Sequence, residues 1–124
     1  MLKHLFIATA LASVAAIPAS AHHSGAMFDD AKEVTLVGTI KEFQYTNPHS
    51  WIQILVPREG GGDVEWSIET AAPIVLLRAG IRPNSLRPGD KVTLRTHPLK
   101  SGGAGGDLID VKKEDGTVLS TRAR

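Results

Sequence analysis

The sequence predicts an all-β domain that contains one short helix. Short runs rich in β-branched and apolar residues recur along the chain, and turns containing glycine or proline separate them. Only one segment, between the third and fourth of these runs, has apolar residues at helical spacing. Cysteine is absent, so the domain must be stable without disulfide bonds.

The first 21 residues are predicted to be a secretory signal peptide. Lys3 and His4 form a short basic region, an apolar run follows over residues 5–17, and Ala19-Ser20-Ala21 has the small residues of a cleavage site. The apolar run is shorter than the roughly 20 residues that a membrane-spanning helix needs. We therefore expect a periplasmic or secreted protein that has no membrane span after cleavage.

Cleavage after Ala21 of the 124-residue chain leaves 103 residues, enough for one small domain. We expect this domain to cover residues 22–120, with residues 121–124 as a frayed C-terminal tail. Cleavage removes one lysine, so 13 Lys and Arg residues remain against 13 Asp and Glu residues. A balanced charge without a basic stripe argues against a nucleic-acid partner.

The first three strands are expected before the helix. Residues 34–40 form the first strand, in which Gly38 permits a bend or close packing. Residues 51–56 and 64–69 form the second and third strands. The glycine-rich turn at residues 60–63 joins these two strands into a hairpin.

The short helix is expected over Pro73–Ala79. Proline suits the first turn of a helix, and Gly80 suits the position just past its end. Ile74, Leu77 and Ile81 share one stripe at spacings of three and four residues. The sequence therefore predicts that this stripe packs against the barrel, since so short a helix needs packing to be stable.

Two further strands follow the helix. Residues 91–97 form the fourth strand, and residues 108–112 form the fifth. A glycine-rich segment over residues 101–106 is expected to be a flexible loop between them. A turn at residues 115–116 then returns the chain, and residues 117–119 pair back onto the fifth strand.

This element order is that of an OB-fold-like five-stranded Greek-key barrel. Closure into a barrel would protect the strand edges of a domain without disulfides. The alternative is an open antiparallel sheet with the helix on one face. The predicted core consists of Leu36, Ile40, Ile52, Ile54, Trp66, Ile68, Leu77, Val92, Leu94 and Val111.

Four histidines remain after cleavage, and each lies at the new terminus or near a strand end. Neutral imidazole is a common ligand for zinc, copper and nickel. Cleavage would also give the first histidine a free α-amino group, which can chelate a metal together with its own ring. The candidate metal ligands are His22, His23, His49 and His97, and copper is favoured over zinc.

Each histidine also has an interpretation that involves no metal. His22 and His23 are compatible with a solvated tail. His49 is compatible with a loop cap that bonds the backbone, and His97 with an ordinary exposed strand residue. No H-x-x-x-H or C-x-x-C spacing decides between these interpretations.

The acidic residues offer two further interpretations. Asp29, Asp30 and Glu33 could form a carboxylate site in place of a histidine site. Glu65 and Glu69 are predicted to lie on the outer face of the third strand, where solvation explains them better than acid–base catalysis.

A second class of function is a metal-free binding module for a small molecule or a protein partner. Its ligand-face candidates are Tyr45, Asn47 and Trp51, since an aromatic and polar surface near a strand end can hold a ligand. Sequence motifs of nucleophilic, phosphate-binding or metalloprotease sites are absent, which favours a binding protein over an enzyme.

The mature chain combines motifs along its whole length, namely His22-His23-Ser24, Gly38-Thr39-Ile40, Asn47-Pro48-His49, Trp66-Ser67-Ile68-Glu69 and His97-Pro98. In this combination it resembles a family of small exported proteobacterial proteins of unknown function. The resemblance implies a periplasmic location and a barrel-like β fold, and it supplies no activity. In size, compartment and strand order the chain is also similar to the periplasmic OB-fold copper chaperone of silver and copper efflux, whose metal motif it lacks.

Overall fold

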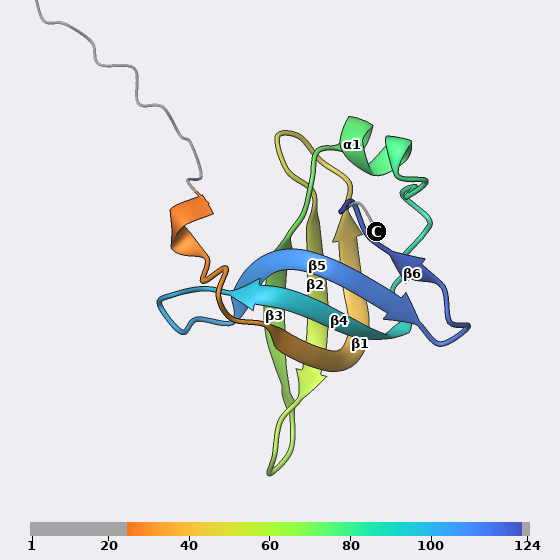
Figure 1. Cartoon of the computed structure of the whole chain (residues 1–124). Coiled ribbons are helices and arrows are strands. Elements are labelled where there is room, and N and C mark those ends of the chain that lie inside the picture. The colour runs from red at the N-terminus through yellow and green to blue at the C-terminus, as the bar shows by residue number, and fades with distance from the viewer. Residues whose placement is uncertain (1–24, 123–124) are drawn as a thin grey trace, which may run out of the picture.

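The computed structural model describes residues 25–122. It confirms a mostly β fold with one short helix (Figure 1). The predicted signal peptide, His22 and His23 lie outside the described residues. The elements are η1 (Gly25–Met27), β1 (Val34–Gln44), β2 (Trp51–Pro57), β3 (Asp63–Glu69), α1 (Pro73–Arg78), β4 (Lys91–Pro98), β5 (Gly105–Lys113) and β6 (Val118–Leu119).

Five strands close into a mixed barrel. The order along the sheet is β3-β2-β1-β4-β5, and β3 also pairs with β5. This last pairing is parallel, whereas the others are antiparallel. β6 adds a two-residue strand to β5. The closed barrel is consistent with the predicted OB-like fold and excludes the open sheet.

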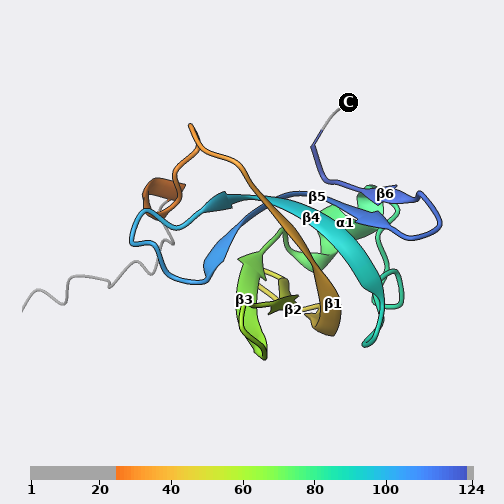
Figure 2. The same ribbon diagram turned by 90° about the horizontal axis from the view of Figure 1, so that it is seen from below.

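Strand β1 belongs to both halves of the barrel. Its first half, residues 34–39, pairs with β4, and its second half, residues 39–44, pairs with β2. Figure 2 shows that β1 curves along its length, as pairing with both strands requires. The pairing with β2 shifts register between Ile40 and Glu42. A Cβ at Gly38 would lie 3.1 Å from the side chain of Ile54, so this glycine permits the close packing that the sequence predicts.

The barrel interior contains most of the predicted core. The buried residues are Leu36, Ile40, Ile52, Ile54, Ile68, Val92, Leu94 and Val111, together with Leu86 and Leu108. Trp66 is partly buried and packs against this cluster. The strand alternation therefore predicted the buried face of every long strand.

The packing predicted for the helix is wrong. Leu77 is 48% exposed and Ile74 is 55% exposed, whereas Leu76 and Ile81 are buried. The helix ends at Arg78, so Ile81 lies beyond it and cannot share a helical stripe with residue 74. Within residues 25–122, no helix has the length and apolar character needed to cross a membrane.

The glycine-rich segment before the fifth strand is not entirely a flexible loop. Gly105 and Gly106 are buried in β5, where they pair with Ser67 and Ile68 of β3. A Cβ at Gly106 would lie 2.5 Å from the carbonyl oxygen of His97. Glycine is therefore needed where β5 fits between β3 and β4 and closes the barrel.

Candidate functional site

A pocket of about 830 Å³ lies where several distant segments of the chain meet. The segment before β1, the loop between β1 and β2, the ends of β3 and β4, the start of β5 and the C-terminal segment all contribute. Its polar and charged lining residues are Asp30, Glu33, His49, Glu69, Thr70, His97, Asp107, Thr121 and Arg122. The size is that of a small-ligand site.

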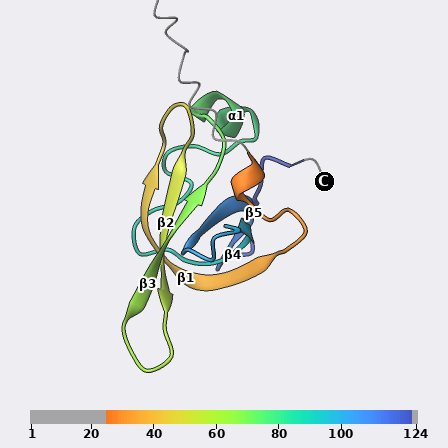
Figure 3. The same cartoon turned by 90° about the vertical axis from the view of Figure 1, so that its left-hand side faces the viewer.

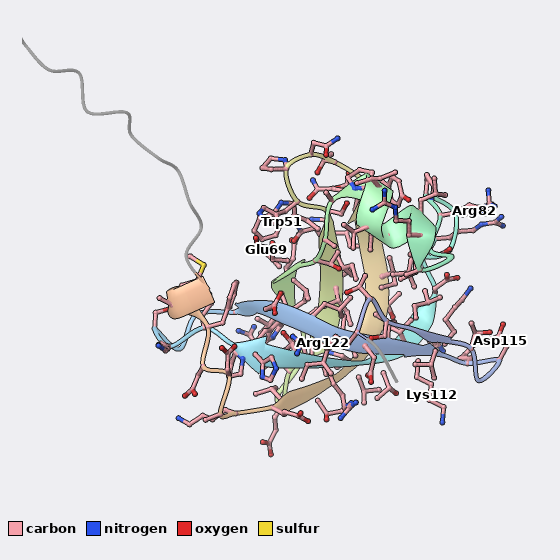
Figure 4. All side chains as sticks on the ribbon, turned by 45° about the horizontal axis from the view of Figure 1, so that its top comes forward. Trp51, Glu69, Arg82, Lys112, Asp115 and Arg122 are labelled. Carbon is pink, nitrogen blue, oxygen red and sulfur yellow. The ribbon has the colours of Figure 1, made fainter. Side chains whose placement is uncertain are left out.

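Strand register places several of these side chains in one row. Trp51 of β2 is opposite Glu69 of β3, Glu69 is opposite Asp107 of β5, and Asp107 is opposite His97 of β4. Directly opposed residues share one face of a sheet. Figure 4 shows Trp51 and Glu69 close together. The parallel β3–β5 pairing that closes the barrel is what brings Glu69 to Asp107.

His97 has one ring nitrogen fixed by the backbone. Its Nδ1 atom lies 2.8 Å from the carbonyl oxygen of Lys32. A carbonyl oxygen only accepts hydrogen bonds, so Nδ1 carries the proton and donates it. In the neutral ring, Nε2 then holds the lone pair. His97 is only 8% exposed, so its interpretation as an exposed strand residue is wrong.

His49 contacts a buried carboxylate. Its Nδ1 atom lies 3.3 Å from Oε1 of Glu69, and the Glu69 side chain is only 6% exposed. Nδ1 is therefore the ring nitrogen of His49 that faces this carboxyl group. His49 and His97 therefore direct the same ring nitrogen to an oxygen of the protein.

Glu69 has an unusual second oxygen. Its Oε2 atom is buried and has no hydrogen-bond partner within residues 25–122. A buried acceptor without a partner typically costs about 1–3 kcal/mol, and more if it is charged. Glu69 lies on the face of β3 opposite the core residue Ile68, as predicted, but it is buried, so the prediction that it is solvated is wrong. Glu65 does fit that prediction, because it is exposed and pairs with Lys41 at 2.8 Å.

Asp107 completes the acidic part of the pocket. Burial raises the pKa of this carboxyl, and the positive charge of Arg122 opposes the shift. His97, and more weakly His49, also lower this pKa, whereas the carboxylate of Asp30 raises it. Arg122 donates to Asp107 across 3.1 Å. Sequence reasoning missed Asp107, since only the barrel closure shows that it lies in the row.

The candidate site residues thus fall into separate groups. His49 and His97 line the same pocket, and so do Asp30 and Glu33 of the carboxylate alternative. Asp29 instead pairs with Lys32 at 3.4 Å.

The ligand-face candidates are divided as well. Tyr45 and Asn47 line a second hollow of about 680 Å³ beside α1. The Tyr45 hydroxyl donates toward two carbonyl oxygens. That of Ile81 lies at 2.9 Å and that of Pro73 at 3.1 Å. Trp51 belongs to the row and not to this hollow.

Two imidazole rings and four carboxyl groups in one pocket are suited to a cation. Within residues 25–122, however, no three His, Cys, Asp or Glu side chains are arranged to hold a metal ion. The described part of the pocket therefore offers an incomplete ligand set for a transition metal.

A family model described as a family of unknown function matches residues 10–108 of the chain. Comparisons with curated proteins and with solved structures found no match.

Proposed function

The chain belongs to DUF6152, a family of unknown function, and we propose that it is an exported barrel protein that binds a transition-metal ion in the pocket lined by His49 and His97. Cu(II) is the favoured ion and Zn(II) the second choice. The role is binding, and we assign no catalytic residues.

The arrangement of the two rings carries this proposal. Each Nδ1 atom faces a protein oxygen, which is Glu69 Oε1 for His49 and the Lys32 carbonyl for His97. Histidines that bind metals commonly donate their other ring nitrogen to a carboxylate or a carbonyl in this way. In both rings this leaves Nε2 to coordinate the ion.

The carboxylates support a cation rather than an anion. Glu69 is buried, and its Oε2 atom lacks a partner within the described residues. A bound cation would give this buried oxygen a partner. Asp107, which opposes Glu69 in the row, adds a second acidic group.

The proposal requires further ligands, and the predicted mature N-terminus can supply them. Gly25 lines the pocket, and His22 precedes it by only three residues. Three residues span at most about 11 Å when extended. The α-amino group and ring of His22, together with His23, are therefore within chain reach of the pocket rim. A nitrogen-rich set of amine and imidazoles favours Cu(II) over the other divalent ions.

Titration with Cu(II) and Zn(II) tests the proposal on protein that starts at His22. We expect Glu69→Gln to weaken binding about 10–100-fold, the usual effect of removing a partner that orients a ligand. His49→Ala and His97→Ala should weaken it more. Glu65→Gln is the matched control, because Glu65 lies on the same strand but is exposed and paired with Lys41.

A second preparation with one extra residue before His22 tests the terminal ligand without altering the barrel. Binding should weaken strongly if the amine coordinates the ion, and thermal unfolding without metal shows whether each variant is folded. Equal affinity in both preparations would exclude the amine. Binding that survives the loss of both His49 and His97 would exclude the pocket.

A metal-free binding module is the second candidate function. The hollow beside α1 favours it, because Tyr45 and Asn47 line this hollow with the apolar residues Ile74 and Leu77. A small molecule or a protein partner would occupy it. Absence of Cu(II) and Zn(II) binding in the titration would favour this candidate.

A further inference from the structure

We infer that the end of the barrel that carries α1 docks onto an anionic lipid bilayer. This end, called the α1 tip below, comprises residues 70–89. The inference is independent of the metal site, because it rests on different residues. It is an alternative to the second candidate function, because Ile74 and Leu77 also line the hollow beside α1.

The α1 tip exposes an unusual amount of apolar surface. Ile74, Val75 and Leu77 are 55%, 42% and 48% exposed. They make up half of the six large exposed apolar residues of the described chain, although α1 has only six residues. Leu76 is the buried residue of the helix, and its three apolar neighbours are all exposed. Clustered apolar side chains on a surface mark a contact site.

The charge of the same region is entirely positive. Residues 70–89 contain Arg78, Arg82 and Arg87 and no Asp or Glu, although the whole chain has 14 basic and 13 acidic residues. The side chains of these three arginines form no ion pair within residues 25–122. Arg95 and Arg122, by contrast, pair with carboxylates. The charge of the tip is therefore available to an anionic partner.

The shape of this region favours a flat partner. Figures 1 and 3 show α1 projecting at one end of the molecule, beside the loop between β1 and β2. Arg82 extends outward from the segment after α1 (Figure 4). The apolar and basic side chains are thus distributed over a projecting end, and a planar anionic surface can contact them together. Aliphatic groups would enter the interface while the arginines meet phosphate headgroups.

Vesicle co-sedimentation tests this inference on protein that starts at His22. Phosphatidylcholine vesicles with and without phosphatidylglycerol serve as the probes, at low and at high salt. Each arginine near an anionic surface strengthens binding about fivefold. The triple variant R78Q/R82Q/R87Q should therefore bind phosphatidylglycerol vesicles roughly 100-fold more weakly. The double variant I74S/L77S should bind about tenfold more weakly, because it loses exposed aliphatic surface.

Matched controls separate the tip from general charge and hydrophobicity. The triple variant R58Q/K100Q/K112Q removes the same net charge from exposed residues outside the tip, and V37S removes another exposed apolar side chain. Both should bind within about twofold of the parent protein, since their residues lie outside the contact. Equal loss in the two triple variants would overturn the inference, and so would equal binding to neutral vesicles. Binding to poly-glutamate but to no vesicle would assign the tip to an acidic protein and overturn it as well.

Discussion

At the residue scale, the row of Glu69, Asp107 and His97 combines burial with charge. Folding brings these groups together where water is partly excluded, and the ionisation of Asp107 responds to its surroundings. Asp107 shows this directly, because burial raises its pKa while Arg122 and His97 oppose the shift. Such a balance is typical of sites that bind charged ligands.

The pKa of Asp107 gives a residue-scale prediction. Arg122→Ala should raise this pKa further, because the variant removes the nearest positive charge that lowers it. NMR titration of the Asp107 carboxyl carbon measures the change, with Arg58→Ala as a control on the hairpin loop at the far end of β2. A pKa that falls or stays constant in Arg122→Ala would contradict the assigned electrostatics.

The same shift predicts how stability depends on pH. A raised pKa in the folded state means that the folded protein holds the Asp107 proton more tightly than the unfolded chain does. This contribution to stability is therefore lost as the pH rises above the ordinary value of 3.8. Urea unfolding at several pH values should show Asp107→Asn gaining stability relative to the parent protein over that range. A relative loss with rising pH would contradict the direction of the shift.

At the element scale, the sequence predicted the strands better than the helix and the loop. In residues 64–69 apolar and polar side chains alternate, which predicts a strand with one face toward the core. β3 confirms this strand, with Ile68 buried in the core and Glu65 exposed. The apolar stripe predicted for the helix is wrong because α1 ends at Arg78, so Ile81 lies in the segment after the helix. Gly105 and Gly106 lack any apolar pattern, and their pairing with β3 and β4 explains why they are in a strand.

Gly106 and Gly103, both in the glycine-rich segment, give an element-scale prediction. Gly106→Ala should destabilise the fold by about 1–3 kcal/mol, because the new Cβ would lie too close to the carbonyl oxygen of His97 and overpack the contact between β5 and β4. Gly103→Ala is the matched control, since its Cβ would lie at an ordinary 3.5 Å from the Ser101 side chain. Urea unfolding measures both. Equal effects would show that the segment acts as the flexible loop that the sequence predicted.

At the scale of the whole molecule, the strand pairing that closes the barrel also brings the site residues together. His49 comes from the loop after β1, Glu69 from β3, and His97 and Asp107 from β4 and β5. No short sequence motif joins them, so the sequence indicated His49 and His97 as candidates by residue type and strand-end position alone. Their common pocket follows from the parallel pairing of β3 with β5.

The proposed ligands predict the pH dependence of metal binding by the whole protein. Imidazole binds a metal only in its neutral form, and histidines titrate near neutral pH. Affinity for Cu(II) should therefore fall steeply between about pH 7 and pH 5. A site built from Asp29, Asp30 and Glu33 would keep its affinity over this range, because carboxylates ordinarily stay ionised down to about pH 4–5. Titrations across pH 5–8 distinguish the two, and a flat profile would exclude the histidines.

NMR of the histidine ring nitrogens, with and without Zn(II), tests the central claim most directly. Above neutral pH and without metal, His49 and His97 should both carry the proton on Nδ1, facing Glu69 and the Lys32 carbonyl. Zn(II) should then shift the Nε2 resonance of both rings and leave both Nδ1 atoms protonated. A proton on Nε2 of either ring, or Nε2 resonances unchanged by Zn(II), would contradict the proposed site.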